Sequence, residues 1–253
     1  MNNEVVLITG GSSGIGLAAA ALFRDQGAKV WITARNEEKL NRAADTLGRS
    51  VRYVPSDVTD AASLGRLSQL LEKEEGKIDV VVNSAGQLEL GAAADSADMA
   101  ERLMAVNYLG VLKTVSSTLP LVRKGSRKSV VILSSFSGRL APPYFAAYSA
   151  TKYALQAYAS ALRQELRREK IHVGLVLPGP VDSPMTENLL GSAMFPVPFG
   201  VPVITVDRAA GAIVDCVLRR KGELPVPRHF HPLLRLGSAF PGIVDLLYRP
   251  YFR

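Results

Sequence analysis

Three polar side chains, Ser135, Tyr148 and Lys152, have the types and spacing needed to move a proton. Tyr148 and Lys152 are four residues apart and therefore share one helix face, while Ser135 ends the preceding apolar run. A phenol has a pKa of about 10, and a neighbouring ammonium favours the phenolate, which brings the acid–base equilibrium closer to neutrality. A serine hydroxyl donating to the same oxygen would stabilise the charge that develops there. The pattern predicts proton transfer to an oxygen, as when hydride reduction of a ketone creates an alkoxide.

A second candidate site is the segment TGGSSGIG (9–16), which lies between the apolar run VVLI and the helical pattern LAAAALF. A glycine-rich turn from strand to helix lets the backbone approach a pyrophosphate, whose charge the free N–H groups and the helix N-terminus stabilise. The spacing of Gly10, Gly14 and Gly16 differs from the more familiar Gly-x-Gly-x2-Gly. The turn predicts a dinucleotide site, although glycines here would also serve tight geometry alone.

The end of the second apolar run indicates which dinucleotide. NAD sites need an acidic residue there to accept bonds from the adenosine ribose hydroxyls, but Ala34 occupies that place and Arg35 follows. An arginine matches a 2′-phosphate, and an alanine leaves room for it. We therefore expect NADP (NADPH), the alternative being that Arg35 merely lies on a solvated loop.

Short β-branched runs alternate with helical patterns along the whole chain. Apolar strands separated by helix-length segments predict an α/β fold, with a parallel sheet covered by helices on both faces. The expected strands are 5–9, 29–34, 51–56, 78–83, 129–135, 172–178 and, more weakly, 223–227. A length of 253 residues fits a single domain, 1–253, with one sizeable core.

Taken together, these motifs resemble the short-chain dehydrogenase/reductase (SDR) family from about Val5 to Val226. They follow one another in family order: TGGSSGIG (9–16), DV (57–58), NSAG (83–86), NYLG (107–110), Ser135 with YSATK (148–152), and PGPVDS (178–183). The resemblance implies a Rossmann-type doubly wound sheet of about seven parallel strands. Two departures are Ser84, where the family more often has asparagine, and Ser183, where it often has threonine.

The resemblance also assigns roles. Catalysis would fall to Ser135, Tyr148, Lys152 and Asn107, the last positioning a water that connects Lys152 to solvent, while Tyr148 and Lys152 would also contact the cofactor. The other expected cofactor contacts are Gly10, Ser12, Ser13, Gly14, Ile15 and Gly16 at the pyrophosphate, Arg35 at the 2′-phosphate, Asp57 and Val58 at adenine, Asn83, Ala85 and Gly86 at the middle, and Pro178, Gly179, Val181 and Ser183 near the nicotinamide.

The histidines and the cysteine give no further prediction of a functional site. His229 and His231 form an HxH pair with no carboxylate or cysteine cluster beside it, so no metal site is expected. His172 begins a predicted strand and reads as structural. Cys216 lies in an apolar helical pattern as a small buried residue; a single cysteine permits no internal disulfide and fits a reducing, cytoplasmic compartment.

Charge and composition limit the kinds of partner that the chain is expected to bind. The formal net charge is +7, and residues 219–253 hold seven basic side chains against two acidic ones. No aromatic residues interleave with basic runs, so nucleic acid is a poor candidate. A homodimer or homotetramer is expected. The small residues Ala154, Ala157 and Ala161 on the helix of Tyr148 would suit either a second subunit or the core.

Two C-terminal segments bear on the substrate. Residues 183–206 are too proline-rich for a helix, and the resemblance implies that they form the substrate lid. They carry Met185, Leu189, Leu190, Met194, Phe195, Val197 and Phe199. They favour a bulky apolar substrate, unless they simply bury against the core or a second subunit. The tail, 228–253, mixes apolar residues with arginines. It suits a peripheral contact with an anionic membrane, but the spread of the arginines favours a cover over its own or a partner's substrate pocket.

The function predicted is NADP(H)-dependent interconversion of a carbonyl and a secondary or primary alcohol, on a steroid-, retinoid- or lipid-like small molecule. One alternative is an enzyme like the sugar-nucleotide epimerases and dehydratases, which share Tyr-x3-Lys but usually carry a larger C-terminal substrate domain. Another is a non-catalytic NADP-sensing module, which would normally lack a catalytic residue, whereas none is missing here.

Overall fold

The computed structural model describes residues 1–48, 50–197 and 200–252. Its centre is a seven-stranded sheet in the order β3-β2-β1-β4-β5-β6-β9, with every neighbouring pair parallel. The strands are β1 (Val5–Thr9), β2 (Lys29–Ala34), β3 (Val51–Pro55), β4 (Val80–Asn83), β5 (Ser129–Leu133), β6 (His172–Pro178) and β9 (Glu223–Val226). All seven predicted strands are confirmed, each ending within two residues of the predicted bounds.

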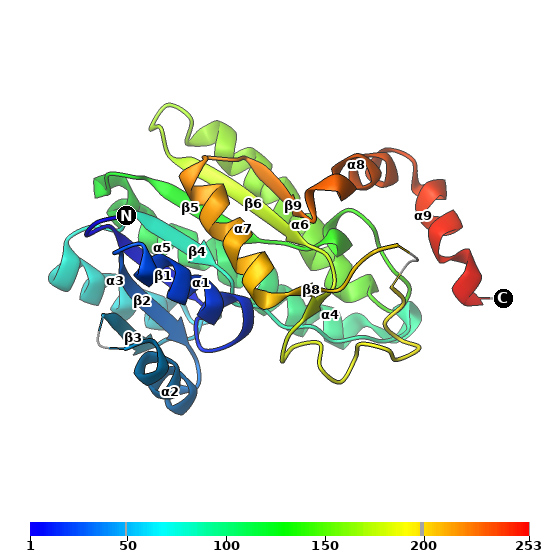
Figure 1. The fold of residues 1–253 in the computed structure, drawn as a ribbon, viewed down its shortest axis with the longest axis horizontal. Coiled ribbons are helices and arrows are strands. Elements are labelled where there is room, and N and C mark those ends of the chain that lie inside the picture. The colour runs from blue at the N-terminus through cyan, green and yellow to red at the C-terminus, as the bar shows by residue number, and fades with distance from the viewer. Residues whose placement is uncertain (49, 198–199, 253) are drawn as a thin grey trace.

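Helices cover both faces of this sheet (Figure 1). One layer holds α1 (Gly14–Asp25), α2 (Glu37–Leu47) and α7 (Val206–Leu218), and the other holds α3 (Ala61–Glu75), α5 (Gly110–Lys124) and α6 (Ala146–Glu165). Successive side chains along each strand point to opposite faces of the sheet and so separate the core into two clusters. In β1, Val6 and Ile8 belong to the cluster under the first helix layer, and Val5 and Leu7 to the cluster under the second. Because both faces are buried, β1 is apolar along its whole length up to Thr9.

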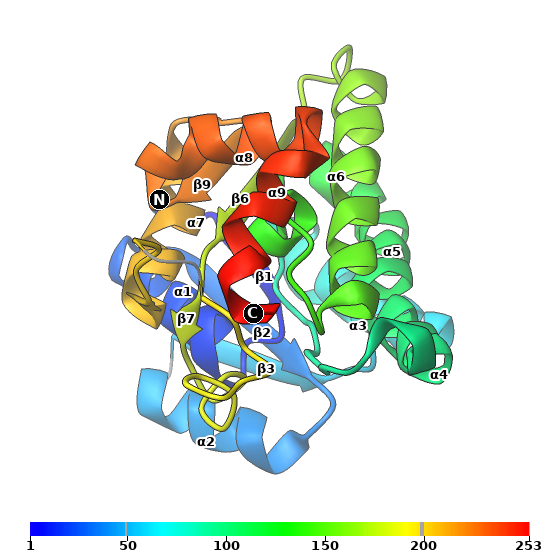
Figure 2. The ribbon, with the colours of Figure 1, turned by 90° about the vertical axis from the view of Figure 1, so that its right-hand side faces the viewer.

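The remaining elements are short and lie towards the carboxyl ends of the strands. They are η1 (Ala93–Asp95), α4 (Ala97–Met104), the π-helical turn η2 (Ala105–Leu109), η3 (Phe136–Gly138), the strand pair β7 (Val181–Asp182) and β8 (Ile204–Thr205), η4 (Arg228–Phe230), α8 (His231–Ala239), α9 (Pro241–Tyr248) and η5 (Arg249–Phe252). Figure 2 shows α9 crossing in front of the sheet, between α6 and the segment that follows β7. No helix among the described residues is long and apolar enough to cross a membrane.

Candidate active site

A cavity of about 500 Å³ opens at the carboxyl edge of the sheet. Its wall is built from the turns that follow the first six strands of the chain, β1 to β6, together with α6, the segment after β7 and helix α9. The predicted site residues that line it are Gly10, Ser12, Ser13, Gly14, Ile15, Gly16, Arg35, Asp57, Val58, Ala85, Gly86, Ser135, Tyr148, Lys152, Pro178, Gly179, Val181 and Ser183. Asn83 and Asn107 are absent from the wall.

The glycine turn has a steric reason for three of its four glycines, one of them Gly11, whose Cβ would lie 2.6 Å from the Ile32 side chain. A Cβ at Gly10 would lie 2.8 Å from the backbone of Ala85, and one at Gly16 would collide with the carbonyl of Gly10. Gly14 has open space beside it but a φ of +52°, which favours glycine. The N-cap residue of α1, Ser13, makes no capping hydrogen bond through its side chain. The first N–H groups of the helix are therefore left for an anion in the cavity.

A polar corner lies where β2 ends. Asn36 caps α2 by accepting a bond of 2.8 Å from the backbone N–H of Lys39. Arg35 and Lys39 both line the cavity, are exposed, and have no hydrogen bond or ion pair from their side chains within the described residues. Lys39 was missed by the sequence reasoning. The sequence feature that could have indicated Lys39 is its position three residues after an Asn N-cap. A cation there interacts unfavourably with the helix dipole unless an anion binds beside it.

The next stretch of wall follows β3 and β4. The Asp57 carboxylate accepts bonds of 2.8 Å from the backbone and the hydroxyl of Thr59, so one of its oxygens is engaged within its own loop. The hydroxyl of Thr9, at the end of β1, accepts from the backbone N–H groups of Ser84 and Ala85 at 3.2 Å each. Thr9, also missed from the sequence, thus fixes the loop of Ala85 and Gly86.

Asn83, expected to support the middle of the cofactor, lies behind this wall. It is the last residue of β4 and is 2% exposed. Its Nδ2 donates to the carbonyl of Val131 in the neighbouring strand at 3.3 Å. Asn83 therefore acts on the cavity only through the strand ends that it joins.

The three residues expected to move the proton meet at the junction of β5 and α6. Ser135 follows β5, and its hydroxyl lies near enough to that of Tyr148 to lower the pKa of the phenol. Lys152 lies one turn further along α6, with its Nζ 5.5 Å from the centre of the Tyr148 ring. The same Nζ donates to the carbonyl of Leu133 at 3.1 Å. The structure thus brings all three side chains to one place in the cavity wall.

Burial is the largest influence on the pKa values of Tyr148 and Lys152. It raises the pKa of Tyr148 to about 12, against a smaller lowering by the hydrogen bond with Ser135. Burial also lowers the pKa of Lys152 to about 8. The expected lowering of the tyrosine pKa by the lysine is thus not seen, because loss of water outweighs it and the ammonium directs a bond at the carbonyl of Leu133.

Asn107 holds neighbouring loops rather than facing the cavity. It lies in the π-helical turn η2, completely buried. Its Oδ1 accepts from the N–H of Gln87 at 2.7 Å, and its Nδ2 donates to the carbonyl of Gln87 at 2.9 Å and to the hydroxyl of Thr151 at 3.2 Å. Both side-chain donors are used. If Asn107 positions a water, the contact falls to its main chain, which the π-turn displaces from regular helix bonding.

The family model for short chain dehydrogenases matches residues 4–192. The chain belongs to this family. An uncharacterized oxidoreductase of Staphylococcus epidermidis is 36% identical over 189 residues, which cover 74% of this chain and 82% of that protein. A dehydrogenase/reductase SDR family protein 7-like of Anopheles gambiae is 36% identical over 199 residues, 75% of this chain and 63% of that protein.

Among solved structures, a short chain dehydrogenase/reductase from Burkholderia phymatum in complex with NAD has a TM-score of 0.84 at 23% identity, over 96% of this chain and 95% of that one. This likeness shows the Rossmann-type fold. The protein is thus an SDR oxidoreductase that acts on CH–OH groups with NAD(P) as acceptor. The family model ends at residue 192, so most of the lid and the whole tail lie beyond it.

The segment expected to be the lid of this SDR is, in its described residues, a series of turns between β7 and β8. Of the lid residues predicted to face substrate, the structure brings Met185 and Phe195 to the cavity. The Phe195 ring packs edge-on against Phe145 with centroids 5.1 Å apart, and Phe145 packs 6.1 Å from Tyr148. Leu189, Leu190, Met194 and Val197 do not line the cavity, and Phe199 lies outside the described residues.

The tail of this SDR contributes to its own cavity, as one of the two sequence interpretations expected. Tyr248 of α9 lines the cavity and is 6% exposed. In α8, Leu234 is fully buried, and Gly237 lies so close to Leu140 that a side chain there would collide with it. Arg253 lies outside the described residues.

His172 and Cys216 have structural partners, the thiol of Cys216 donating to the carbonyl of Lys221 at 3.1 Å. His172 bonds to the hydroxyl of Ser129 at 2.8 Å and to the carbonyl of Lys221 at 2.9 Å, and burial lowers its pKa. Cys216 is fully buried, and burial raises its thiol pKa to about 12. His231 lies 3.7 Å from Glu223. Within the described ranges, no three His, Cys, Asp or Glu side chains gather as metal ligands.

Proposed function

We propose that the protein interconverts a carbonyl and a secondary or primary alcohol of a bulky apolar molecule, with NADP(H) as the hydride carrier. One observation carries the proposal: Ser135, Tyr148 and Lys152 line the same cavity as the glycine turn and two cations, Arg35 and Lys39, that have no partner among the described residues. The turn fits a dinucleotide because its glycines keep side chains out of the cavity floor and its helix N–H groups remain uncapped. The bound cofactor would supply or accept the hydride.

The chain's own residues would handle the oxygen and its proton. During reduction, the hydroxyls of Ser135 and Tyr148 donate hydrogen bonds to the carbonyl oxygen. Tyr148 then transfers its proton as the C–O bond gains negative charge, which leaves a phenolate and a neutral alcohol. The ammonium of Lys152, 5.5 Å from the ring, stabilises that phenolate. Oxidation of an alcohol runs the same steps backwards, with the phenolate taking the proton.

The preference for NADP rests on the corner after β2. Ala34 leaves space, and Arg35 and Lys39 offer two cations for a 2′-phosphate with no carboxylate among the lining residues at that corner to repel it. The solved relative from Burkholderia phymatum was crystallised with NAD, so the two cofactors must be compared directly on this chain.

The substrate end of the cavity is mostly apolar. Its lining includes Leu88, Phe136, Leu140, Pro142, Phe145, Met185, Phe195, Val201 and Tyr248. Such a wall supports a steroid-, retinoid- or lipid-like carbonyl over a sugar nucleotide, whose hydroxyls would lose water without gaining partners. Retention of all three proton-handling residues argues against a non-catalytic sensor.

The test follows oxidation of NADPH and of NADH with a panel of steroids, retinoids, long-chain ketones and aldehydes, and small polar sugars. We expect turnover with apolar carbonyls and a higher kcat/KM for NADPH. A panel in which only small hydrophilic carbonyls react would overturn the substrate class, and equal or better use of NADH would overturn the cofactor choice.

A homo-oligomer is part of the proposal. On α6, Ala157 and Ala161 are exposed and therefore do not pack in the core. Tyr153 on the same helix is 41% exposed. A second copy would cover this surface. Light scattering of the purified chain should give at least twice the mass of 27.2 kDa, and a stable monomer would contradict it.

A further inference from the structure

The C-terminal helices α8 and α9 have two different faces. On the inner face, Leu234 and Tyr248 are buried, and Tyr248 lines the cavity. On the outer face, Leu236 is 48%, Phe240 60% and Leu246 67% exposed. Phe240 and Leu246 are the two most exposed large hydrophobic side chains in the part of the chain that the structure describes. We call Leu236, Phe240 and Leu246 the outer apolar face.

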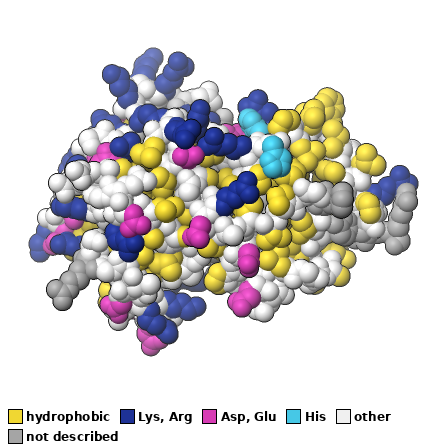
Figure 3. All heavy atoms as spheres, in the orientation of Figure 1, with side chains coloured by type: hydrophobic (Ala, Val, Ile, Leu, Met, Phe, Trp, Pro, Cys, Tyr) yellow, Lys and Arg dark blue, Asp and Glu magenta, His cyan; other side chains and the backbone are white. Residues whose placement is uncertain are grey.

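This face does not stand alone on the surface. Figure 3 shows hydrophobic side chains gathered on the part of the molecule where Figure 1 places α8, α9 and the lid. On the lid, Met185 and Met194 are 45% and 39% exposed, and Met185 also lines the cavity. The cavity mouth is therefore bordered on two sides by elements with exposed apolar side chains, an arrangement that marks an interaction surface.

The charges beside the outer apolar face indicate what covers it. Arg235 on α8 and Arg249, directly after α9, are exposed, and neither has a hydrogen bond or ion pair from its side chain within the described ranges. Asp245 is the one acidic residue on these helices. Two copies meeting through this face would bring the unpaired arginines together, whereas anionic lipid headgroups would neutralise them while the apolar side chains enter the acyl boundary.

We propose that the outer apolar face of α8 and α9 docks on an anionic lipid surface, so that the cavity mouth receives its substrate from the bilayer. This inference rests on the proposed apolar substrate class, which it deepens. Docking would place the lid beside the membrane, with Tyr248 behind the outer apolar face in the cavity wall. An apolar carbonyl would then pass from lipid into that wall without crossing water.

The test measures co-sedimentation of the full chain with vesicles of phosphatidylcholine, alone or mixed with phosphatidylglycerol, at low and high salt. No substrate is needed, so the outcome is independent of the activity. We expect binding to the anionic vesicles, weakened by salt. Replacing the whole outer apolar face by Leu236→Ser, Phe240→Ser and Leu246→Ser should weaken binding at least about tenfold. Replacing both arginines by Arg235→Gln and Arg249→Gln should weaken it similarly.

Matched controls separate this face from general attraction by a basic protein. Leu218→Ser removes an equally exposed leucine (45%) from α7, and Arg167→Gln with Arg168→Gln removes two exposed arginines from the opposite, amino edge. Both controls should bind as the parent does. Equal losses in the controls, or no binding of the parent to anionic vesicles at low salt, would overturn the proposal.

Insertion of the outer apolar face into the bilayer can be followed separately, by tryptophan fluorescence. The natural chain has a single tryptophan, Trp31, which is 4% exposed in the sheet. Phe240→Trp should therefore add emission that shifts to shorter wavelength on vesicles and is quenched by lipids brominated in their acyl chains. A self-association that Leu246→Ser abolishes, with no quenching in Phe240→Trp, would show that a second copy covers this face and would overturn lipid docking.

Discussion

Burial decides the protonation of the two central residues. The loss of water raises the pKa of Tyr148 to about 12 and lowers that of Lys152 to about 8. The tyrosine is thus held as an acid, ready to donate, while the lysine stays close to the pH at which it changes charge. In the proposed mechanism, these opposite shifts give the two side chains different tasks within one turn of α6.

Tyr148→Phe should remove turnover while leaving the cofactor bound. The substitution keeps the ring that packs 6.1 Å from Phe145 and deletes only the hydroxyl that moves the proton. We expect kcat to fall by at least about a thousandfold, and the dissociation constant for NADPH, from fluorescence titration, to change less than about threefold. A variant that keeps kcat within a few-fold of the parent would exclude Tyr148 as the acid.

The two directions of the reaction should respond oppositely to pH. Alcohol oxidation needs the phenolate of Tyr148, whose fraction rises about tenfold per pH unit below the pKa of about 12. Carbonyl reduction needs the phenol, which is fully present in that range, and should decline only as Lys152 loses its proton near its pKa of about 8. Initial rates of kcat/KM against pH in both directions test this. An oxidation rate that ignores pH would contradict the assignment.

Lys39→Gln should weaken NADPH and spare NADH. The lysine lies in the cavity wall without a partner of its own among the described residues, so its loss affects only a ligand that carries the 2′-phosphate. We expect KM for NADPH to rise about tenfold. Lys73→Gln, on the exposed last turn of α3, is the matched control. Equal effects on both cofactors would mean that Lys39 supports the fold instead.

At the scale of elements, the parts fixed by local chemistry were predictable. Strand β1 has buried side chains throughout and leads into a turn whose glycines are required either by close contacts or, at Gly14, by a positive φ, so VVLIT and TGGSSGIG identified both. Tyr148 and Lys152 were found because helix periodicity alone puts them on one face. Charged or polar residues at element ends were harder to assign: Lys39 lines the cavity from the first turn of α2, and its residue type alone does not indicate this place.

The parts fixed by long-range packing could not be derived from sequence patterns. Nothing in the lid sequence distinguishes Phe195, which packs on Phe145, from Met194, which is exposed. Likewise, Tyr248 reaches the cavity because α8 and α9 fold back over Leu140. Asn83 shows the converse: its motif is at the site, but its side chain joins β4 to β5, so any support for the cofactor from this side chain is indirect and stays a prediction.

Helix α9 should determine the size of the accepted substrate. Tyr248→Ala opens the wall on one side, so a bulky apolar carbonyl loses packing that a small one never used. We expect kcat/KM to fall about tenfold or more for the best bulky substrate, with little change for a short-chain ketone. Asp245→Ala, an exposed position on the same helix, serves as the control. Parallel losses for both substrates would contradict the specificity role.

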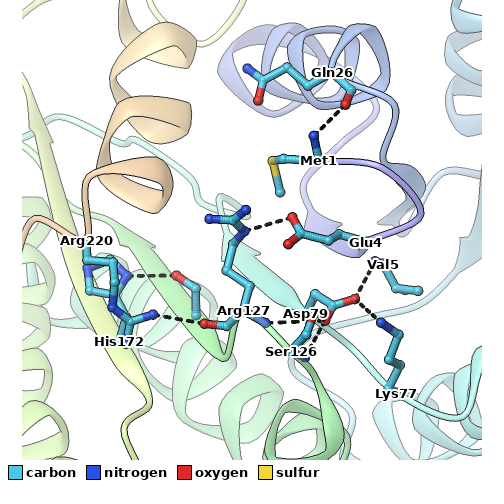
Figure 4. A network of polar contacts seen from close by, with 11 residues as sticks. Met1, Glu4, Val5, Gln26, Lys77, Asp79, Ser126, Arg127, His172 and Arg220 are labelled. Atoms are coloured by element: carbon cyan, nitrogen blue, oxygen red, sulfur yellow. Dashed lines mark hydrogen bonds and ion pairs between the residues drawn. The ribbon is translucent and has the colours of Figure 1, made fainter.

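At the scale of the whole molecule, the two edges of the sheet have different tasks. The carboxyl edge holds the cavity, and the amino edge holds a polar network that joins distant segments (Figure 4). There, Asp79 accepts from the backbone of Val5 at 2.8 Å and from the backbone and hydroxyl of Ser126 at 2.6 and 2.8 Å, and it pairs with Lys77 at 2.9 Å. Beside it, Arg127 pairs with Glu4 at 2.7 Å.

The Asp79 carboxylate should support stability in a pH-dependent way. Burial would raise its pKa, but the bonds from Lys77, Val5 and Ser126 outweigh burial and lower the pKa from 3.8 to about 2. A carboxyl whose pKa is lower in the folded chain stabilises the fold above its unfolded pKa. That contribution, about 2 kcal/mol, is lost as the pH falls through the folded value of about 2.

Asp79→Asn should therefore lower the free energy of unfolding by about 2 kcal/mol at neutral pH, with the difference from the parent shrinking between pH 3.8 and about 2. Urea unfolding followed by circular dichroism across that range measures it. Because the network lies at the edge opposite the cavity, kcat of the folded variant should match the parent. Asp25→Asn removes a carboxylate that is 59% exposed and should change stability little. A gap between parent and Asp79→Asn that stays constant down to the acid limit would show that the side chain's shape, and not its charge, holds the amino edge together.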